Sequence, residues 1–274
     1  MGVVPSVVAK RVAQLEHELQ ARLFERTTRK VTLTEAGERL HARAAGVVAE
    51  FEDLLQAVRR DEGKPEGHLH VMAPTTLTME QLGEVFCAFL AAHPRITMEL
   101  SLVDRSTNPA EAGVDLAISG RAASYEGVVD VQLCPVQPVL CAAPRYLAQH
   151  GNPAHPRDLA DHACLVFSAT GTHWAFQSSR GVLAVDVRAR LQADDNRTLL
   201  HAALAGLGIA LLPSYIAGPQ IGHSTLIQLL PKFAPQNWFK AYVPRRKLGL
   251  ARVQALLEFV QQHWAHAAAN QPTR

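Results

Sequence analysis

The sequence is poor in cysteine, and its four cysteines form no motif. Cys87, Cys134, Cys141 and Cys164 include no C-x-x-C pair and no spacing typical of a zinc ligand set. Isolated thiols in a chain of 274 residues are typical of small core residues in a reducing cytoplasm. The thirteen histidines are scattered along the chain. The sequence therefore predicts no zinc ribbon and no metal site.

Long hydrophobic runs are also missing. No stretch of about 18 apolar residues could cross a bilayer. The first twelve residues, MGVVPSVVAKRV, lack the charged segment and following apolar segment of a secretory signal. Hydrophobic residues nevertheless make up 48% of the chain and charged residues 19%, which is a globular composition. We expect a soluble cytoplasmic protein without a membrane partner.

The common catalytic motifs are absent as well. The chain has no G-x-S-x-G elbow, no Walker loop and no H-E-x-x-H helix. Gly206-Leu207-Gly208 is followed by Leu211 where a dinucleotide fingerprint needs glycine, and it stands between a helix and a strand. The sequence predicts neither an enzyme nor a cofactor.

The net charge of the chain is close to zero, but the charged residues are unevenly distributed along it. The chain has 27 Lys and Arg against 25 Asp and Glu, a formal charge of +2. Residues 1–30 hold six basic and three acidic side chains, so the rest of the chain carries −1. A segment of +3 suits a nucleic-acid phosphate backbone, although such a segment is more often a solvated face.

The start of the chain has a regular apolar pattern. Val8, Val12, Leu15 and Leu19 follow Pro5-Ser6 at helical spacing. A basic turn and the alternating residues Val31 to Leu33 then predict a short strand. A long helix follows, with Thr34 or Thr32 as its cap, and its 4-3-4-3-4 spacing makes a seam that predicts dimerisation, with packing inside the domain as the alternative. The seam residues are Leu40, Ala44, Val47, Phe51, Leu54 and Val58.

The remaining 200 residues predict an α/β fold. A charged segment rich in chain breakers, residues 61–67, ends the long helix. After it, strands alternate with helices in two successive series, which indicates mostly parallel sheets in two lobes with a cleft. The expected strands are 68–73, 96–103, 114–119, 128–133, 139–143, 165–167, 183–191, 209–212, 225–229 and 239–243, and the expected helices are 74–92, 156–160, 197–205, 213–217 and 250–267.

Three short motifs follow one another near the start of the chain. They are Leu15-Glu16, Leu23-Phe24-x-Arg26 and Leu33-Thr34-x-Ala36-Gly37, and the later segments 113–118 and 206–213 follow in the same order. In these motifs the chain resembles the LysR-type transcriptional regulators over residues 3–265. The resemblance implies an α/β protein with a partial winged helix-turn-helix, a long linker helix and a two-lobed effector domain that resembles periplasmic binding proteins.

The resemblance also implies domain limits and DNA contacts. The winged helix-turn-helix would cover residues 1–34, the dimerising helix 35–62 and the effector domain about 67–266. Lobe I would hold about 67–137 and 244–266, and lobe II about 144–238. Double-stranded promoter DNA would be contacted by Ser6, Val7, Lys10 and Arg11 on the recognition helix and by Arg26, Thr28, Arg29 and Lys30 on the wing.

The effector cleft would lie between lobes joined by crossings near 138–143 and 239–244. Expected effector contacts at strand and helix ends are Thr75, Thr76, Ser119, Phe167, Ser168 and Asn196. The effector would be a small molecule such as a carboxylate or an aromatic compound. Helix capping is the alternative role for the two threonines and for Asn196. Packing is the expected role of Trp174, Trp238 and Trp264.

Two further implications concern mechanism and the start of the chain. Effector binding would change lobe closure, the pairing of dimers into tetramers, DNA bending and, indirectly, access of RNA polymerase. The family's first helix has no counterpart before Met1, so Val8, Val12 and Leu15 would be exposed and DNA binding weakened. The alternative function is therefore a DNA-binding-deficient ligand receptor or a dominant-negative dimer partner.

Overall fold

The computed structural model describes residues 4–26, 31–40, 44, 47–48, 51, 65–179, 181–235 and 237–269. The chain forms two compact units, Met1–Gly63 and Lys64–Arg274. No helix within the described ranges is long and apolar enough to cross a membrane.

The first unit begins with a helix and a short hairpin. Helix α1 (Pro5–Glu18) starts with proline at its first position, where the missing N–H costs nothing. Strands β1 (Phe24–Arg26) and β2 (Val31–Leu33) pair antiparallel, and residues 35–40 are helical. The helix and the short strand predicted from the sequence are both confirmed.

The motif residues hold this unit together through backbone contacts. The Glu16 carboxylate accepts hydrogen bonds from the backbone N–H of Leu23 at 2.7 Å and of Phe24 at 3.0 Å. The Thr34 hydroxyl accepts one from the N–H of Gly37 at 3.0 Å, which makes Thr34 the cap. A Cβ atom on Gly37 would collide with the Leu23 carbonyl oxygen, so this position requires glycine.

The first lobe of the second unit contains a five-stranded sheet. Its order is β4-β3-β5-β14-β6, with β3 (Gly67–Ala73), β4 (Ile96–Leu102), β5 (Leu116–Ser119), β6 (Val128–Val136) and β14 (Asn237–Pro244). Strand β3 is parallel to β4 and β5, but β14 is antiparallel to β5 and β6. The sheet is mixed, and the predicted mostly parallel sheet is wrong because β14 enters from the other lobe without a crossover helix.

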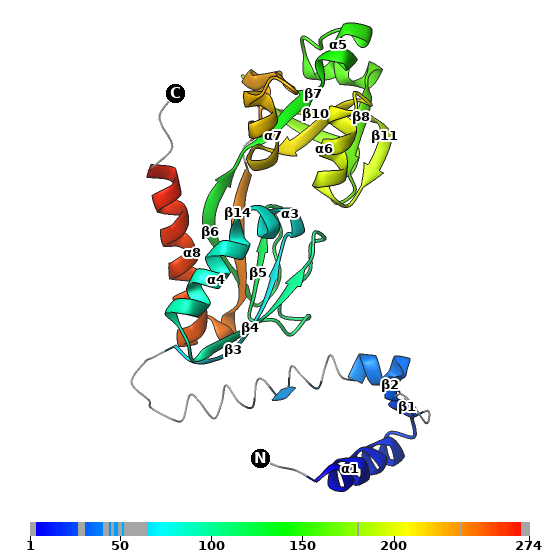
Figure 1. The fold of residues 1–274 in the computed structure, drawn as a ribbon, viewed down its shortest axis with the longest axis vertical. Helices are drawn as coiled ribbons and strands as arrows, with labels where there is room; N and C mark the ends of the chain where they lie inside the picture. Colours follow the sequence, from blue (N-terminus) through cyan, green and yellow to red (C-terminus); the bar gives the residue numbers. More distant parts are fainter. Residues whose placement is uncertain are drawn as a thin grey trace. The chain divides into compact units, whose positions relative to one another are not determined.

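Helices cover one face of this sheet. The chain is helical from Thr75 to Ala92 through α3 (Thr75–Leu77), the π-helical η1 (Thr78–Leu82) and α4 (Gly83–Ala92). Helix α8 (Ala251–Ala269) lies beside α4, and η4 (Arg245–Lys247) precedes it (Figure 1). Their apolar faces bury Leu69, Val71 and Phe89 in one core with Val253 and Leu256.

The second lobe contains a sheet of order β11-β8-β12-β7-β13 and a separate hairpin. Its strands are β7 (Pro138–Ala142), β8 (Ala163–Phe167), β9 (His173–Ser178), β10 (Gly181–Asp186), β11 (Arg188–Ala193), β12 (Ile209–Pro213) and β13 (Ile227–Leu229). Its helices are α5 (Pro144–His150), η2 (Pro156–Asp161), α6 (Asn196–Leu204), α7 (Ser214–Gly222) and η3 (Pro231–Phe233).

The predicted single strand over 183–191 is wrong. Strand β10 pairs with β9 in the hairpin, whereas β11 pairs with β8 in the main sheet. The buried Val187 stands between the two strands, so the apolar pattern continues although the pairing partner changes.

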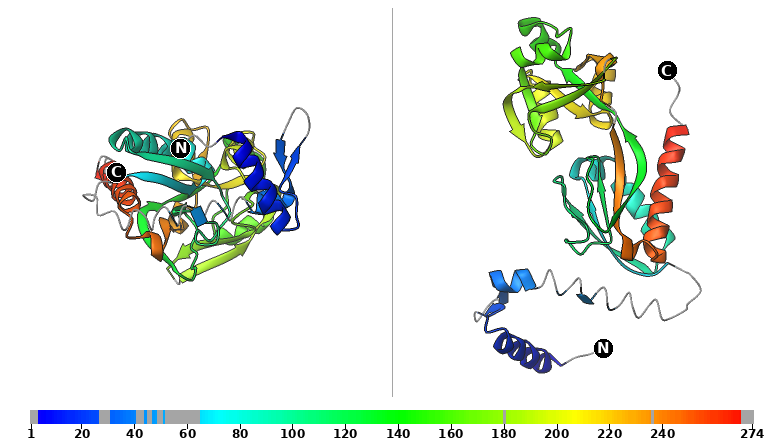
Figure 2. Two further views of the ribbon diagram at one scale, coloured as in Figure 1. Left: turned by 90° about the horizontal axis from the view of Figure 1, so that it is seen from below. Right: turned by 180° about the vertical axis from the view of Figure 1, so that it is seen from behind.

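Two connections join the lobes. One passes through Gln137 between β6 and β7, and the other lies between Leu229 and Asn237 (Figure 1; Figure 2 shows the same connections from behind). Both come earlier than predicted, because β7 lies wholly in the second sheet and β14 wholly in the first.

The cysteines divide into buried and accessible thiols. Cys141 and Cys164 are buried, Cys134 is partly buried and Cys87 is exposed. Burial raises the pKa of the thiols of Cys134, Cys141 and Cys164 to about 12, so these remain protonated at neutral pH. The predicted core role holds for the buried pair and is wrong for Cys87.

A buried tyrosine and a histidine form a polar contact in the second lobe. Tyr146 is fully buried, and its oxygen accepts a hydrogen bond from the N–H of Ala163 at 3.0 Å. The same oxygen lies 3.1 Å from Nδ1 of His162, and it donates to that nitrogen in the neutral tautomer that carries its proton on Nε2. Burial lowers the pKa of His162, and the nearby His150 lowers it further.

We expect the second unit to lose stability as the pH falls below about 6.5, the ordinary pKa of histidine. Unfolded His162 takes up a proton there, whereas folded His162 does so only at lower pH, so protons favour the unfolded chain. Urea titrations at pH 5.5 and 7.5 measure the loss. It should shrink in His162→Gln and persist in the control His223→Gln, whose histidine is exposed. An equal loss in both variants would contradict this assignment.

Candidate functional site

A cavity of about 530 Å³ lies between the two lobes. The first sheet and the segments that follow its strands supply Pro74, Thr76, Val103, Asp104, Ser119, Gly120, Arg121, Ala122, Val136, Asn237 and Phe239. The second lobe and the connections supply Pro138, Phe167, Thr170, His173, Trp174, Ala175, Gln177, Val182, Asn196, Leu211, Leu212, Pro213, Tyr215 and Pro235. The size suits a small molecule.

The two threonines at the start of α3 have different roles. Thr76 lines the cavity, is only 2% exposed, and its hydroxyl has no hydrogen-bond partner. The backbone N–H of Thr75 donates to Asp104 Oδ1 at 3.1 Å. The N-cap residue is Pro74, and the first N–H is satisfied by Asp104 rather than by a threonine, so the capping role is wrong for both threonines. A buried hydroxyl without a partner is costly, which favours a ligand atom beside Thr76.

Asn196 also lies at the cavity, and capping is the wrong role for it. The N-cap of α6 is Asp195, whose carboxylate accepts from the N–H of Arg197 at 3.2 Å and of Thr198 at 2.8 Å. These hydrogen bonds lower the pKa of Asp195, although burial opposes them as the largest single influence. Asn196 is 8% exposed and lines the cavity.

Of the residues at strand ends that were predicted to contact a ligand, some line the cavity and one does not. Ser119 and Phe167 line the cavity, whereas Ser168 is not among the described residues that do. The backbone N–H of Ser168 instead donates to the Ala193 carbonyl at 2.7 Å. The Ser119 hydroxyl accepts from the N–H of Arg121 at 3.1 Å, so it shapes the turn that follows β5.

The sequence patterns did not predict that several further residues line the cavity. Hairpin β9–β10 brings His173, Trp174, Gln177 and Val182 to the cavity, and Trp174 packs in the lobe core as well. Trp174 and Phe176 alternate with His173, Ala175 and Gln177, and this period-two spacing of large aromatic residues is a strand signal that could have been found. Tyr215 lines the cavity and packs against the cores of both lobes. Burial raises the pKa of its hydroxyl, and the nearby carboxylates of Asp104 and Glu80 raise this pKa further.

An ion pair connects the lobes beside the cavity. Arg197, at the start of α6, donates through Nε to Glu80 Oε1 at 2.9 Å, and its Nη2 contacts the same oxygen. Glu80 belongs to the π-helical η1 of the first lobe, and such distortions of helices are frequent at functional sites. The pair therefore favours the arrangement of the lobes seen in this structure.

We expect the Glu80–Arg197 pair to contribute about 0.5–1 kcal/mol, because both side chains are partly exposed. A double-mutant cycle with Glu80→Gln and Arg197→Gln, followed by urea denaturation, measures this coupling. Glu84→Gln, on an exposed position of the same helix, is the control. A coupling energy of zero would show that the pair does not stabilise this arrangement of the lobes.

The described DNA-contact candidates are exposed on α1. Ser6, Val7, Lys10 and Arg11 all face solvent, and Val7 is 48% exposed. The predicted apolar stripe of the same helix is accessible too, with Val8 48% and Leu15 40% exposed. The side chain of Arg26 and the residues Thr28, Arg29 and Lys30 lie outside the described part of the chain.

Part of the predicted seam lies in described residues. Ala44, Val47 and Phe51 are helical and exposed, Val47 by 65% and Phe51 by 61%, and Leu40 is half-buried. Leu54 and Val58 fall outside the described residues. A row of exposed apolar side chains at heptad spacing favours a partner helix.

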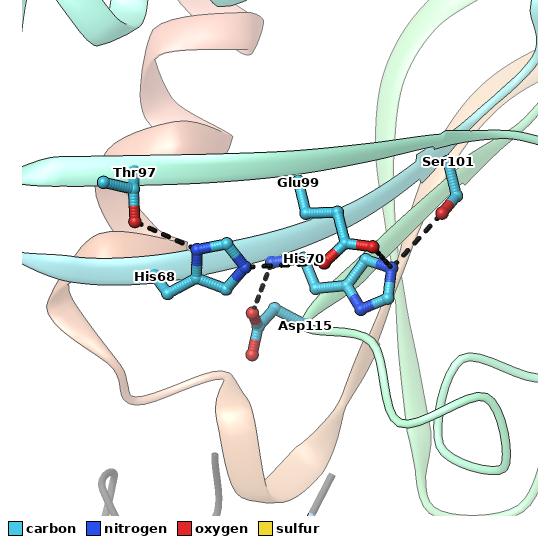
Figure 3. A network of polar contacts seen from close by, with 6 residues as sticks. All are labelled: His68, His70, Thr97, Glu99, Ser101 and Asp115. Carbon is cyan, nitrogen blue, oxygen red and sulfur yellow. Dashed lines mark hydrogen bonds and ion pairs between the residues drawn. The ribbon is translucent and has the colours of Figure 1, made fainter. Parts of the chain in front are cut away.

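Two histidines on β3 form a polar network with β4 (Figure 3). His68 Nδ1 lies 2.9 Å from the Thr97 hydroxyl, His70 Nε2 lies 3.3 Å from the Ser101 hydroxyl, and Glu99 lies between the two rings. The imidazoles are 3.8 and 3.9 Å from the Glu99 carboxylate. Within the described ranges, no three His, Cys, Asp or Glu side chains are arranged to hold a metal.

Comparisons with known proteins agree over most of the chain. Residues 62–265 match the family described as LysR substrate binding domain, and residues 1–38 match the family described as bacterial regulatory helix-turn-helix protein, lysR family. The chain is 30% identical over 266 residues to the HTH-type transcriptional regulator PtxR of Pseudomonas aeruginosa, covering 96% of this chain and 85% of that protein. It is 29% identical over 274 residues to the HTH-type transcriptional regulator DmlR of Escherichia coli, covering 98% and 89%.

A solved structure shows the same architecture. The structure of CrgA, a LysR-type transcriptional regulator from Neisseria meningitidis, superposes with a TM-score of 0.63 at 26% identity. The superposition covers 95% of this chain and 90% of that one.

Proposed function

The chain belongs to the LysR family of bacterial transcriptional regulators, and from this premise we propose that it binds promoter DNA under the control of a small-molecule effector. The cavity between the lobes is the observation that carries the proposal, because it is lined by Thr76, whose buried hydroxyl has no hydrogen-bond partner. The proposed function involves no catalytic step and no cofactor.

The DNA-binding surface would be α1 with the hairpin β1–β2. Lys10 and Arg11 stand exposed on α1, where they suit base edges or phosphates, and Ser6 suits a phosphate oxygen. Glu16 fixes the hairpin relative to α1 through two backbone N–H groups. This contact supports α1 and the wing acting as one DNA-binding surface.

Regulation would couple the cavity to the DNA. An effector that contacts Thr76 in one lobe and Asn196 in the other favours the closed lobes and shifts a pre-existing equilibrium. Dimers formed through the seam at Val47 and Phe51 would pair into tetramers and so carry this shift to DNA bending and, indirectly, to RNA polymerase.

The experiment is capture of genomic DNA fragments by the full chain, followed by mobility-shift titrations at several salt concentrations. Arg11→Ala should weaken binding and reduce the slope of log K against log salt by about 0.9, the value for one lost phosphate contact. The control is Arg188→Ala, an exposed arginine on β11. Failure to retain any fragment would favour the alternative function, a ligand receptor that does not bind DNA.

A further inference from the structure

Three neighbouring strands of the first sheet end at the cavity with different polar groups. Strands β4, β3 and β5 are parallel neighbours, so their carboxyl ends meet at one edge. Asp104 follows β4, Thr76 follows β3 and Arg121 follows β5, and all three line the cavity. Since strands lie about 4.8 Å apart, the acidic and basic positions are about 10 Å apart at the backbone, with the hydroxyl between them.

The Asp104 carboxylate occupies the position at the start of the helix that an effector carboxylate would otherwise take. Asp104 Oδ1 accepts the first N–H of the helix that starts at Thr75. A ligand carboxylate placed there would meet a like charge instead of a free amide. Asp104 is half-buried, and the Thr75 N–H stabilises its carboxylate without neutralising it, so a net negative charge remains at this side of the cavity. A cationic group on a ligand would offset it.

The opposite side offers a cation. Arg121 is half-buried at the end of β5, where its N–H donates to the Ser119 hydroxyl and its carbonyl accepts from the Tyr242 hydroxyl at 2.8 Å. These contacts fix the backbone of Arg121, which lines the cavity, and a guanidinium there suits a carboxylate. Thr76 stands between the two charges, and its buried hydroxyl has both a donor and an acceptor capacity that no described residue uses.

Apolar and aromatic side chains form much of the remaining wall of the cavity, beside polar residues that include His173, Gln177 and Asn196. Phe167, Trp174 and Leu211 line it from the second lobe, and Phe239 lines it from the first. An apolar body between these side chains would bury hydrophobic surface while its polar end faces the three strand ends.

We propose that the effector is a small zwitterion with an apolar body, of the amino-acid type, whose ammonium group faces Asp104 and whose carboxylate faces Arg121. This inference rests on the proposed function of the cleft. It replaces the carboxylate or aromatic effector expected from the sequence with a molecule that carries both charges.

The test is thermal denaturation of the full chain with matched probes. Each apolar or aromatic α-amino acid is added beside its amine and its deaminated acid, for example L-phenylalanine, phenethylamine and 3-phenylpropionate. We expect at least one amino acid to raise the melting temperature more than either counterpart, because it alone satisfies both charges. Stabilisation by ligand grows with its concentration relative to its dissociation constant.

Variants assign the two ends. Asp104→Asn keeps an acceptor for the Thr75 N–H, so the variant should fold. It should bind the amino acid at least tenfold more weakly and the deaminated acid more tightly than the unmodified protein does. Arg121→Gln should weaken the amino acid and spare the amine. Glu126→Gln, an exposed carboxylate, is the control.

The outcomes separate the inference from the proposed function. Stabilisation by acids alone, an unchanged response of Asp104→Asn, or no response to any probe would overturn the zwitterion. The DNA capture experiment uses no effector, so its result judges the regulator independently of these outcomes.

Discussion

Replacing Lys247 by methionine is expected to lower the free energy of unfolding of the second unit by about 3 kcal/mol, the lower end of the range for breaking a buried ion pair. Lys247 Nζ lies 2.7 Å from Asp115 Oδ1, and both side chains are 4% exposed. The variant leaves the Asp115 carboxylate buried with the His70 N–H at 2.8 Å and Arg252 Nη2 at 3.8 Å. These remaining donors keep the cost from rising further.

Urea denaturation followed by circular dichroism measures the change. Lys232→Met, at an exposed position of η3, is the matched control and should change stability by less than about 0.5 kcal/mol. Adding Asp115→Asn to Lys247→Met should restore part of the loss, because the unpaired charge is then gone. A loss in Lys247→Met no larger than in Lys232→Met would contradict the role of the pair.

Replacing Trp174 by alanine should cost about 3–5 kcal/mol, the range for removing a large aromatic side chain from a core. Trp174 is 2% exposed on β9 and packs with Phe176 and Val185 in the core of the second lobe. It also lines the cavity, so the variant should bind an effector more weakly even where it remains folded.

The two contributions can be separated. Trp174→Phe keeps an aromatic ring and should lose clearly less stability than Trp174→Ala. The control Trp238→Ala removes an indole that is 44% exposed on β14 and should cost much less than Trp174→Ala. Similar losses in the two alanine variants would show that Trp174 does not support the core.

Local patterns predicted much of this molecule. The spacing from Val8 to Leu15 indicated α1, and the position of Thr76 after a buried strand indicated the cleft. Such features depend on residues near one another in the chain, where periodicity and capping chemistry operate. The N-cap of α6 could have been assigned in the same way, because Asp195 precedes Asn196 and aspartate is a preferred cap.

Long-range pairings could not be predicted in this way. The partner of Asp115 is Lys247, 132 residues later, and no local pattern connects them. The antiparallel entry of β14 depends on the chain returning from the second lobe. Trp174 was assigned to packing alone, since only the folded hairpin places it between a core and a cavity.

The two connections between the lobes differ in length, and this difference limits how the lobes can move. One connection is the single residue Gln137, whose carbonyl also accepts from the N–H of Ser214 at 2.9 Å. The other follows η3, which packs in the second lobe through Phe233, and begins at Ala234 before β14 starts at Asn237. A connection of one residue holds the two lobes together at one point, whereas a longer connection allows more displacement. We therefore expect the lobes to rotate about Gln137, and the displacement of a cavity residue should grow with its distance from Gln137.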